Sequence, residues 1–180
     1  NLRNVFNTET DMLLIEDICE LIVRNNFFQS PLIEVYYGIL MMLTSPEKES
    51  EDYFLRVVKL INQSNTKFPI PDLNNTYQYV KNFCIRMINT GNDGYRKILF
   101  ELYKTILSNK RIMNHGDFSP WEYKNIVTLG LRLQEEKWVR EFIRKYLNFL
   151  PIDERANALT YNSAMLSYYH KNFRQTLKLL

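Results

Sequence analysis

Apolar residues recur three or four positions apart along almost all of the 180-residue sequence, which is the spacing of helices that bury one face. No part of the sequence needs the strict alternation of a half-buried strand to explain it. The chain has only five Gly and six Pro, which are few for a turn-rich β-sandwich, and its 46% hydrophobic content suits a packed core. The sequence therefore predicts an all-α fold.

Three helix starts are marked by Ser-Pro pairs, at residues 30–31, 45–46 and 119–120. A serine hydroxyl can cap the free N–H groups of a helix, and proline suits the first helical position, where no N–H is needed. Glu122 follows Ser119 by three residues, as in a capping box. We expect nine helices, at 9–25, 31–44, 47–63, 73–89, 93–108, 120–133, 136–149, 153–170 and 173–180.

Segments rich in Asn, Gly, Pro and Ser separate these helices, so neighbouring helices should form antiparallel hairpins that stack to bury their second apolar face. We expect one helical-repeat domain over 1–180, with helix pairs at 1–68, a middle hairpin and long loop at 69–118, and regular repeats at 119–180.

The first residue is not Met and the last helix has no capping residue, so we expect a fragment of a longer protein. An open edge at residues 173–180 should expose Phe173, Leu177 and Leu180. These side chains should face either a following hairpin or a second copy of the chain.

An internal period appears near the carboxyl end of the sequence. Gly130 and Ala164 are 34 residues apart, and so are Val139 and Phe173. With Leu129 before Gly130, this pattern resembles the tetratricopeptide (TPR) repeat, in which a small residue on the first helix lets its neighbour approach closely. Upstream, Gly38 could play the same part. Its partner face would be formed by Phe54, Val57 and Ile61.

The TPR resemblance implies a right-handed α-α superhelix whose first helices line a concave groove. It also implies a non-enzymatic scaffold that binds an extended or helical peptide through aromatic anchors. Carried over by position from Gly130 and Ala164, the groove residues are Lys124, Val127, Leu131, Gln134, Tyr161, Met165, Tyr168 and Tyr169. The family has a small Ala where this chain has Phe142.

Helical arrays that bind RNA have repeats of nearly the same length, so a nucleic-acid-binding module is the alternative. The net charge is only +3, and the lysines and arginines over 137–145 are interleaved with Glu, which disfavours nucleic acid.

The longest apolar run, 35–43, is too short to cross a bilayer and should be a buried helix. Two distant cysteines, Cys19 and Cys84, suit a reducing, cytoplasmic setting.

Few residues could support catalysis. His115 lies beside Asp117, and His170 follows Tyr168-Tyr169. Cys84 would need one of these histidines nearby to act as a nucleophile. Both histidines are expected in turns or on the surface, while the Tyr-Tyr and Met-Met pairs within 36–42 are expected in the core. We therefore expect no enzyme activity, no metal and no cofactor.

Overall fold

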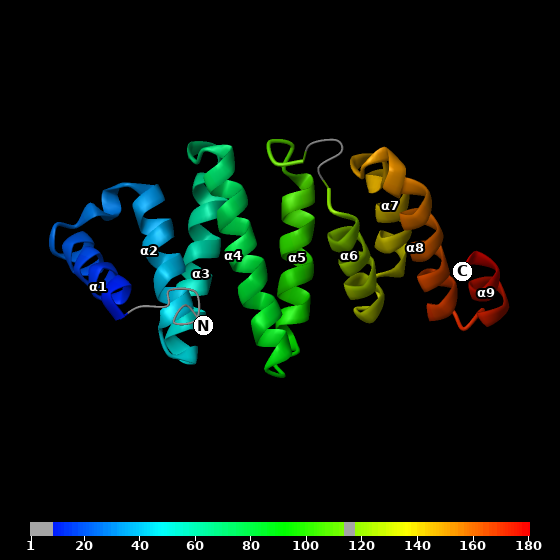
Figure 1. Cartoon of the computed structure of the whole chain (residues 1–180), viewed down its shortest axis with the longest axis horizontal. Helices are drawn as coiled ribbons and strands as arrows, with labels where there is room; N and C mark the ends of the chain where they lie inside the picture. Colours follow the sequence, from blue (N-terminus) through cyan, green and yellow to red (C-terminus); the bar gives the residue numbers. More distant parts are fainter. Residues whose placement is uncertain (1–8, 114–117) are drawn as a thin grey trace. The chain divides into compact units, whose positions relative to one another are not determined.

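The structure is a computed structural model that describes residues 9–113 and 118–180, and every regular element within these ranges is a helix (Figure 1). This confirms the all-α prediction, with every helix boundary within three residues of its expected position. The helices are α1 (Glu9–Arg24), α2 (Pro31–Thr44), α3 (Glu47–Ser64), α4 (Ile70–Asn89), α5 (Gly94–Ser108), α6 (Pro120–Arg132), α7 (Glu136–Tyr146), α8 (Arg155–Tyr169) and α9 (Phe173–Leu179).

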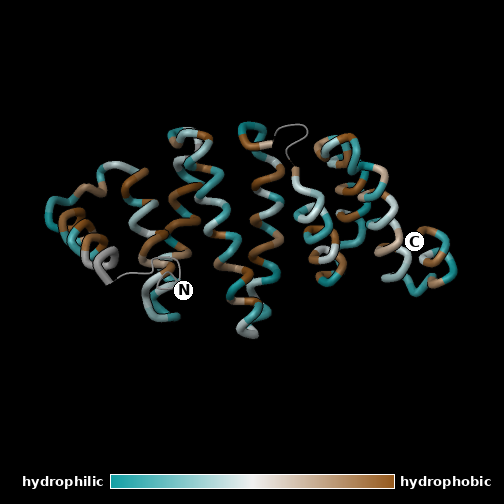
Figure 2. Tube along the Cα trace, viewed as in Figure 1, coloured by the Kyte–Doolittle hydropathy of each residue, from teal (hydrophilic) through white to brown (hydrophobic). Residues whose placement is uncertain are grey.

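Short 3-10 turns account for the small differences at the helix ends, for example at Leu147–Phe149 after α7 and Ile152–Glu154 before α8. The chain divides into two compact units, residues 1–86 and 87–180, and the boundary lies within α4. Along the helices of both units, hydrophobic and hydrophilic residues alternate with the helical turn (Figure 2). None of the described helices combines the length and apolarity needed to cross a bilayer.

The Ser-Pro pairs set helix starts mainly through proline. Helices α2 and α6 begin with proline, as predicted, but neither Ser30 nor Ser119 makes a side-chain capping hydrogen bond. The capping box expected at Ser119 and Glu122 therefore lacks its hydrogen bond from the helix to the serine hydroxyl. Helix α3 begins one residue after Pro46, and the carbonyl of Ser45 instead accepts a 2.7 Å hydrogen bond from Ser50 Oγ. The fixed backbone angle of proline is enough to start these helices.

In the first unit, α2 packs closely on α3 at Gly38. A Cβ atom at Gly38 would lie 2.7 Å from Val57 Cγ2, closer than two carbons can approach. Phe54 and Val57 are almost fully buried, and Phe54 stacks on Phe83 of α4 with ring centroids 4.8 Å apart. The predicted small-residue role of Gly38 is confirmed. Tyr36, expected in the core, is instead 37% exposed, and its hydroxyl donates to the Asp72 carboxylate.

The second unit repeats this contact between α6 and α7. A Cβ atom at Gly130 would lie 2.5 Å from Val139 Cγ2 and 3.1 Å from the ring of Phe100 on α5. Around this point, the rings of Phe100 and Trp138 meet edge to face, and Trp138 stacks on Phe142. Phe142 is therefore part of an aromatic cluster at the position where the TPR resemblance implied a small residue.

Three turns close in the same way, after α4, α6 and α8. Gly91, Gln134 and Lys171 have positive φ angles of 98°, 63° and 58°. The next amide in each turn donates to a carbonyl five residues back, over 2.9–3.0 Å. This is the Schellman arrangement, which satisfies carbonyl groups that the helix end leaves free.

The equivalent turn residues correct the expected period. Gln134 and Lys171 are 37 residues apart, and Gly91 lies 43 before Gln134, so the spacing is neither 34 nor constant. The pairing of Val139 with Phe173 is wrong as well, because Val139 is fully buried whereas Phe173 is 55% exposed. Thr176, which follows Val139 by 37 residues, is the buried equivalent. Helix α8 is two residues longer than α6, which shifts everything after it.

We expect Gly130→Ala to lower the free energy of unfolding by about 1–3 kcal/mol, because the new methyl group overlaps Val139 Cγ2. This loss outweighs the roughly 0.5–1 kcal/mol that Ala gains over Gly in a helix. Urea denaturation followed by circular dichroism measures the change.

Adding Val139→Ala should make the double variant more stable than the sum of the two single effects predicts, since the two positions are in contact. Gly94→Ala is the matched control, because its closest neighbour is the side-chain oxygen of exposed Asn92, which can turn away. Equal losses at Gly94 and Gly130 would contradict the contact.

Candidate functional site

The second unit has a pocket of about 430 Å³ between α6 and α8, closed at one end by the start of α9. Its walls are apolar and aromatic, with two cationic side chains. The lining residues are Thr128, Leu131, Arg132, Met165, Tyr168, Tyr169, Lys171 and Phe173. Its volume lies within the range of about 300–1,000 Å³ typical of ligand pockets.

The pocket is built from equivalent positions of two successive hairpins. Residues 128, 131 and 132 of α6 correspond to residues 165, 168 and 169 of α8, each 37 positions later. Both sets follow the i, i+3, i+4 spacing of one helix face. This is the same offset that relates the turn residues Gln134 and Lys171. The pocket is thus formed by the equivalent faces of α6 and α8.

Four of the eight residues predicted for a groove line this pocket together, namely Leu131, Met165, Tyr168 and Tyr169. Two others meet beside it. The Lys124 ammonium lies 4.9 Å from the ring centroid of Tyr161 and 4.9 Å from that of Trp121. Such cation–π contacts hold Lys124 against the surface of α6.

The remaining two predicted groove residues do not line the pocket. Val127 is fully buried, so its expected exposure was wrong. Helix α6 packs against α5, α7 and α8, which leaves only a narrow strip of it open. Gln134 is exposed, but it forms the turn after α6.

The groove residues predicted from the 34-residue spacing did not include four that line the pocket, namely Thr128, Arg132, Lys171 and Phe173. The signal that could have found them is the turn register. Once α6 and α8 are aligned on their carboxyl ends, Thr128 and Arg132 fall opposite Met165 and Tyr169.

The pocket is electropositive at its edge. Arg132 and Lys171 are exposed, and neither forms a salt bridge within the described part of the chain. Residues 155–180 include no Asp or Glu. The ring of Phe173 packs edge to face on Tyr168, with centroids 5.7 Å apart, and so fixes one apolar wall. The arrangement suits an apolar group with a negative charge beside it.

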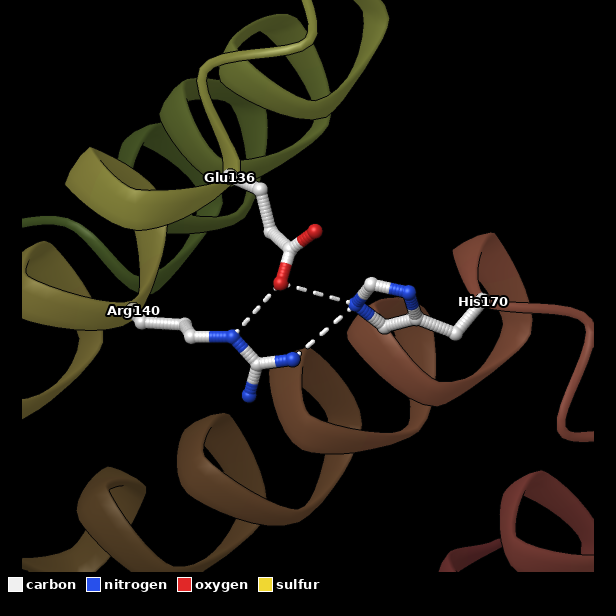
Figure 3. A network of polar contacts seen from close by, with 3 residues as sticks. All are labelled: Glu136, Arg140 and His170. Carbon is white, nitrogen blue, oxygen red and sulfur yellow. Dashed lines mark hydrogen bonds and ion pairs between the residues drawn. The ribbon is translucent and has the colours of Figure 1, made fainter.

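A network at the turn after α8 fixes the position of this wall (Figure 3). Glu136 Oε1 of α7 lies 2.7 Å from Arg140 Nε and 2.9 Å from His170 Nε2. Arg140 also approaches His170 Nε2, at 2.9 Å. The histidine nitrogen can donate to Glu136 or accept from Arg140, but not both. In either state His170, expected in a turn or on the surface, links the turn to α7.

The residues considered for catalysis are not assembled into a reactive group where they can be described. His115 and Asp117 lie outside the described residues. Cys84 is fully buried, and burial raises the pKa of its thiol to about 12, so it stays protonated. Burial, together with nearby Glu16, also raises the pKa of the partly exposed Cys19. Among described residues, no group of three His, Cys, Asp or Glu side chains could hold a metal.

We expect a maleimide to label Cys19 in the native chain at pH 7 and Cys84 only after unfolding. Labelling of Cys84 should be at least about 100-fold slower, because it requires opening of the first unit. Mass spectrometry of digested samples over time measures both rates. A Cys19→Ser variant should show almost no native labelling, and rapid labelling of Cys84 would contradict its burial.

The pKa of Glu136 is lowered, chiefly by its hydrogen bond from Arg140 and then by the charge of His170. A lowered carboxyl pKa stabilises the fold above the unfolded value, about 4.3, and this contribution disappears as the pH falls through the lower folded value. Glu136→Gln should therefore reduce the melting temperature at pH 7, and the difference from the parent chain should shrink below about pH 4.

Glu135→Gln is the matched control, because it removes an adjacent exposed carboxylate that forms no salt bridge among the described residues. Its effect should be smaller at pH 7. Equal effects of the two substitutions at every pH would show that the network does not stabilise the turn.

The chain matches no protein-family model, no curated protein and no solved structure. Its function is therefore inferred from the chemistry and geometry of the pocket between α6 and α8.

Proposed function

We propose that this chain is a non-enzymatic protein-interaction module with a TPR-like stack of helix hairpins. In this proposal the pocket between α6 and α8 binds an apolar side chain of a peptide or helix from a protein partner. A peptide anchored in this way is held by burial of a few large side chains, as in other helix- and peptide-binding grooves.

The observation that carries the proposal is the repeated lining of the pocket. In TPR-like stacks the first helices of successive hairpins face the ligand, and here the lining comes from equivalent faces of α6 and α8. The close glycine–valine contacts at Gly38 and Gly130 also support TPR-like packing within each unit.

The lining indicates the chemistry of the ligand. Leu131, Met165 and Phe173 offer apolar area, and Met and Tyr side chains adapt to ligands of different shape. Arg132 and Lys171 add positive charge at the edge. We therefore expect a ligand with a Leu, Ile, Met or Phe anchor and an adjacent Asp or Glu.

The pocket offers little for acid–base or nucleophilic chemistry. Its described lining contains no His, Cys, Asp or Glu. An apolar floor also suits a hydrocarbon side chain better than a phosphate, which supports a protein ligand over nucleic acid. The positive charge over 155–180 nevertheless makes single-stranded RNA the necessary comparison.

The test is selection of peptides from a random display library on the folded chain. We expect the selected peptides to share an apolar residue flanked by Asp or Glu. Met165→Glu should weaken them at least about tenfold, because it places a charge in the apolar pocket. Fluorescence anisotropy measures the affinities, and circular dichroism verifies folding.

Leu159→Glu is the matched control, since Leu159 is on α8, is 41% exposed and does not line the pocket. Tyr168→Ala provides a second pocket variant, because Tyr168 is 58% exposed and its loss leaves the core intact. Peptides that bind Met165→Glu as tightly as the parent chain would overturn the proposal. Tight, steeply salt-dependent RNA binding without peptide binding would favour the nucleic-acid function.

A further inference from the structure

Helix α1 has a wider apolar face than the rest of the first unit covers. Ile18, Cys19 and Ile22 line a groove against α2. Ile18 is nevertheless 46% exposed, and Leu14 and Leu21, outside the groove lining, are 63% and 54% exposed. These three residues follow the i, i+4, i+7 spacing of a single stripe. The stripe is thus the kind of surface with which a helix enters a groove of another molecule.

The same helix is acidic. Glu16, Asp17 and Glu20 are all exposed, and Arg24 is the one basic residue over 14–24. None of the three carboxylates forms a salt bridge within the described ranges. An apolar stripe with unpaired negative charge beside it matches the ligand chemistry expected for the pocket between α6 and α8.

The pocket offers the opposite charge. Besides Arg132 and Lys171 at its edge, Arg174 and Lys178 of α9 are exposed, and no carboxylate side chain occurs over 155–180. Phe173, which lines the pocket, also remains 55% exposed. The two surfaces are therefore complementary, because both expose apolar side chains and their charges are opposite.

We propose that α1 of one copy of this chain docks in the α6/α8 pocket of a second copy. The inference rests on the proposed function, because it uses the same pocket and names its occupant. Ile18 and Leu21 enter the pocket, and Asp17 and Glu20 lie near Arg132 and Lys171. Opposite charges fix the orientation and speed association, while the buried apolar side chains hold the complex.

This contact is head to tail, because the two surfaces that meet are different. In a pair, one copy keeps a free pocket and the other keeps a free α1, so further copies add until a ring closes or a filament grows. A symmetric contact between two α1 helices is disfavoured, because Glu16, Asp17 and Glu20 would face their own counterparts.

The experiment is sedimentation velocity of the whole chain over a range of concentrations. We expect the parent chain to form dimers and larger species as concentration rises. Ile18→Gln with Leu21→Gln removes the stripe, and Met165→Glu blocks the pocket. Each variant alone should remain monomeric, with the dissociation constant raised at least about tenfold.

An equimolar mixture of these two variants is the decisive sample. One variant keeps its pocket and the other keeps its α1, so the mixture should form dimers and nothing larger. Leu55→Gln is the matched control, since Leu55 lies on α3, is 59% exposed and belongs to neither surface. It should associate like the parent chain.

Charge exchange gives an independent test with less risk to folding. Arg132→Glu with Lys171→Glu should abolish self-association, and so should Asp17→Lys with Glu20→Lys. A mixture of these two variants should again form dimers and larger species, because each α1 then meets a pocket of opposite charge on the other variant. A mixture that stays monomeric would overturn the proposed orientation.

Other outcomes separate this inference from the function on which it rests. A monomeric parent chain whose pocket still binds selected peptides would overturn self-association and leave the proposed function standing. Association that survives Met165→Glu but not the Ile18→Gln and Leu21→Gln changes would indicate a contact between α1 helices and overturn the head-to-tail arrangement. A monomeric chain whose pocket binds no peptide would overturn both.

Discussion

The fold depends on the close approach of a glycine backbone to a valine side chain on the next helix. Gly130 meets Val139, and Gly38 meets Val57, at distances that leave no room for a Cβ atom. The contact at Gly38 lies in the first unit and the contact at Gly130 lies in the second, so each unit has its own glycine–valine contact. Because α6 lies so close to α7, large rings such as Phe142 fill the space around the contact rather than separating the helices.

The pocket follows from this packing. Helix α6 is covered by three neighbours, so its one open strip lies beside α8, which presents the same face 37 residues later. The contacts of His170 with Glu136 and Arg140 hold the turn after α8. That turn carries Lys171 in a left-handed conformation, next to Phe173, so the network also sets one edge of the pocket.

Much of the helical architecture could be predicted because it depends on local properties. Proline at the first helical position, apolar spacing and polar loops act within a few residues, and they placed every described helix to within three residues. Gly38 and Gly130 could also be identified, since a glycine within an apolar helix face needs a packing reason. Half of the predicted groove residues line the pocket, because local helical spacing places Met165, Tyr168 and Tyr169 on one face of α8, opposite Leu131 of α6.

The sequence by itself determined the helices, their order and the glycines at which they approach. Only the tertiary structure decided the register and the open surface. Helices α6 and α8 begin 35 residues apart, and α8 is two residues longer, so their carboxyl ends lie 37 residues apart rather than the expected 34. Three neighbouring helices bury Val127 and leave Arg132 exposed. The exposure of a side chain depends on every helix packed around it, and residues far away in the sequence supply those helices.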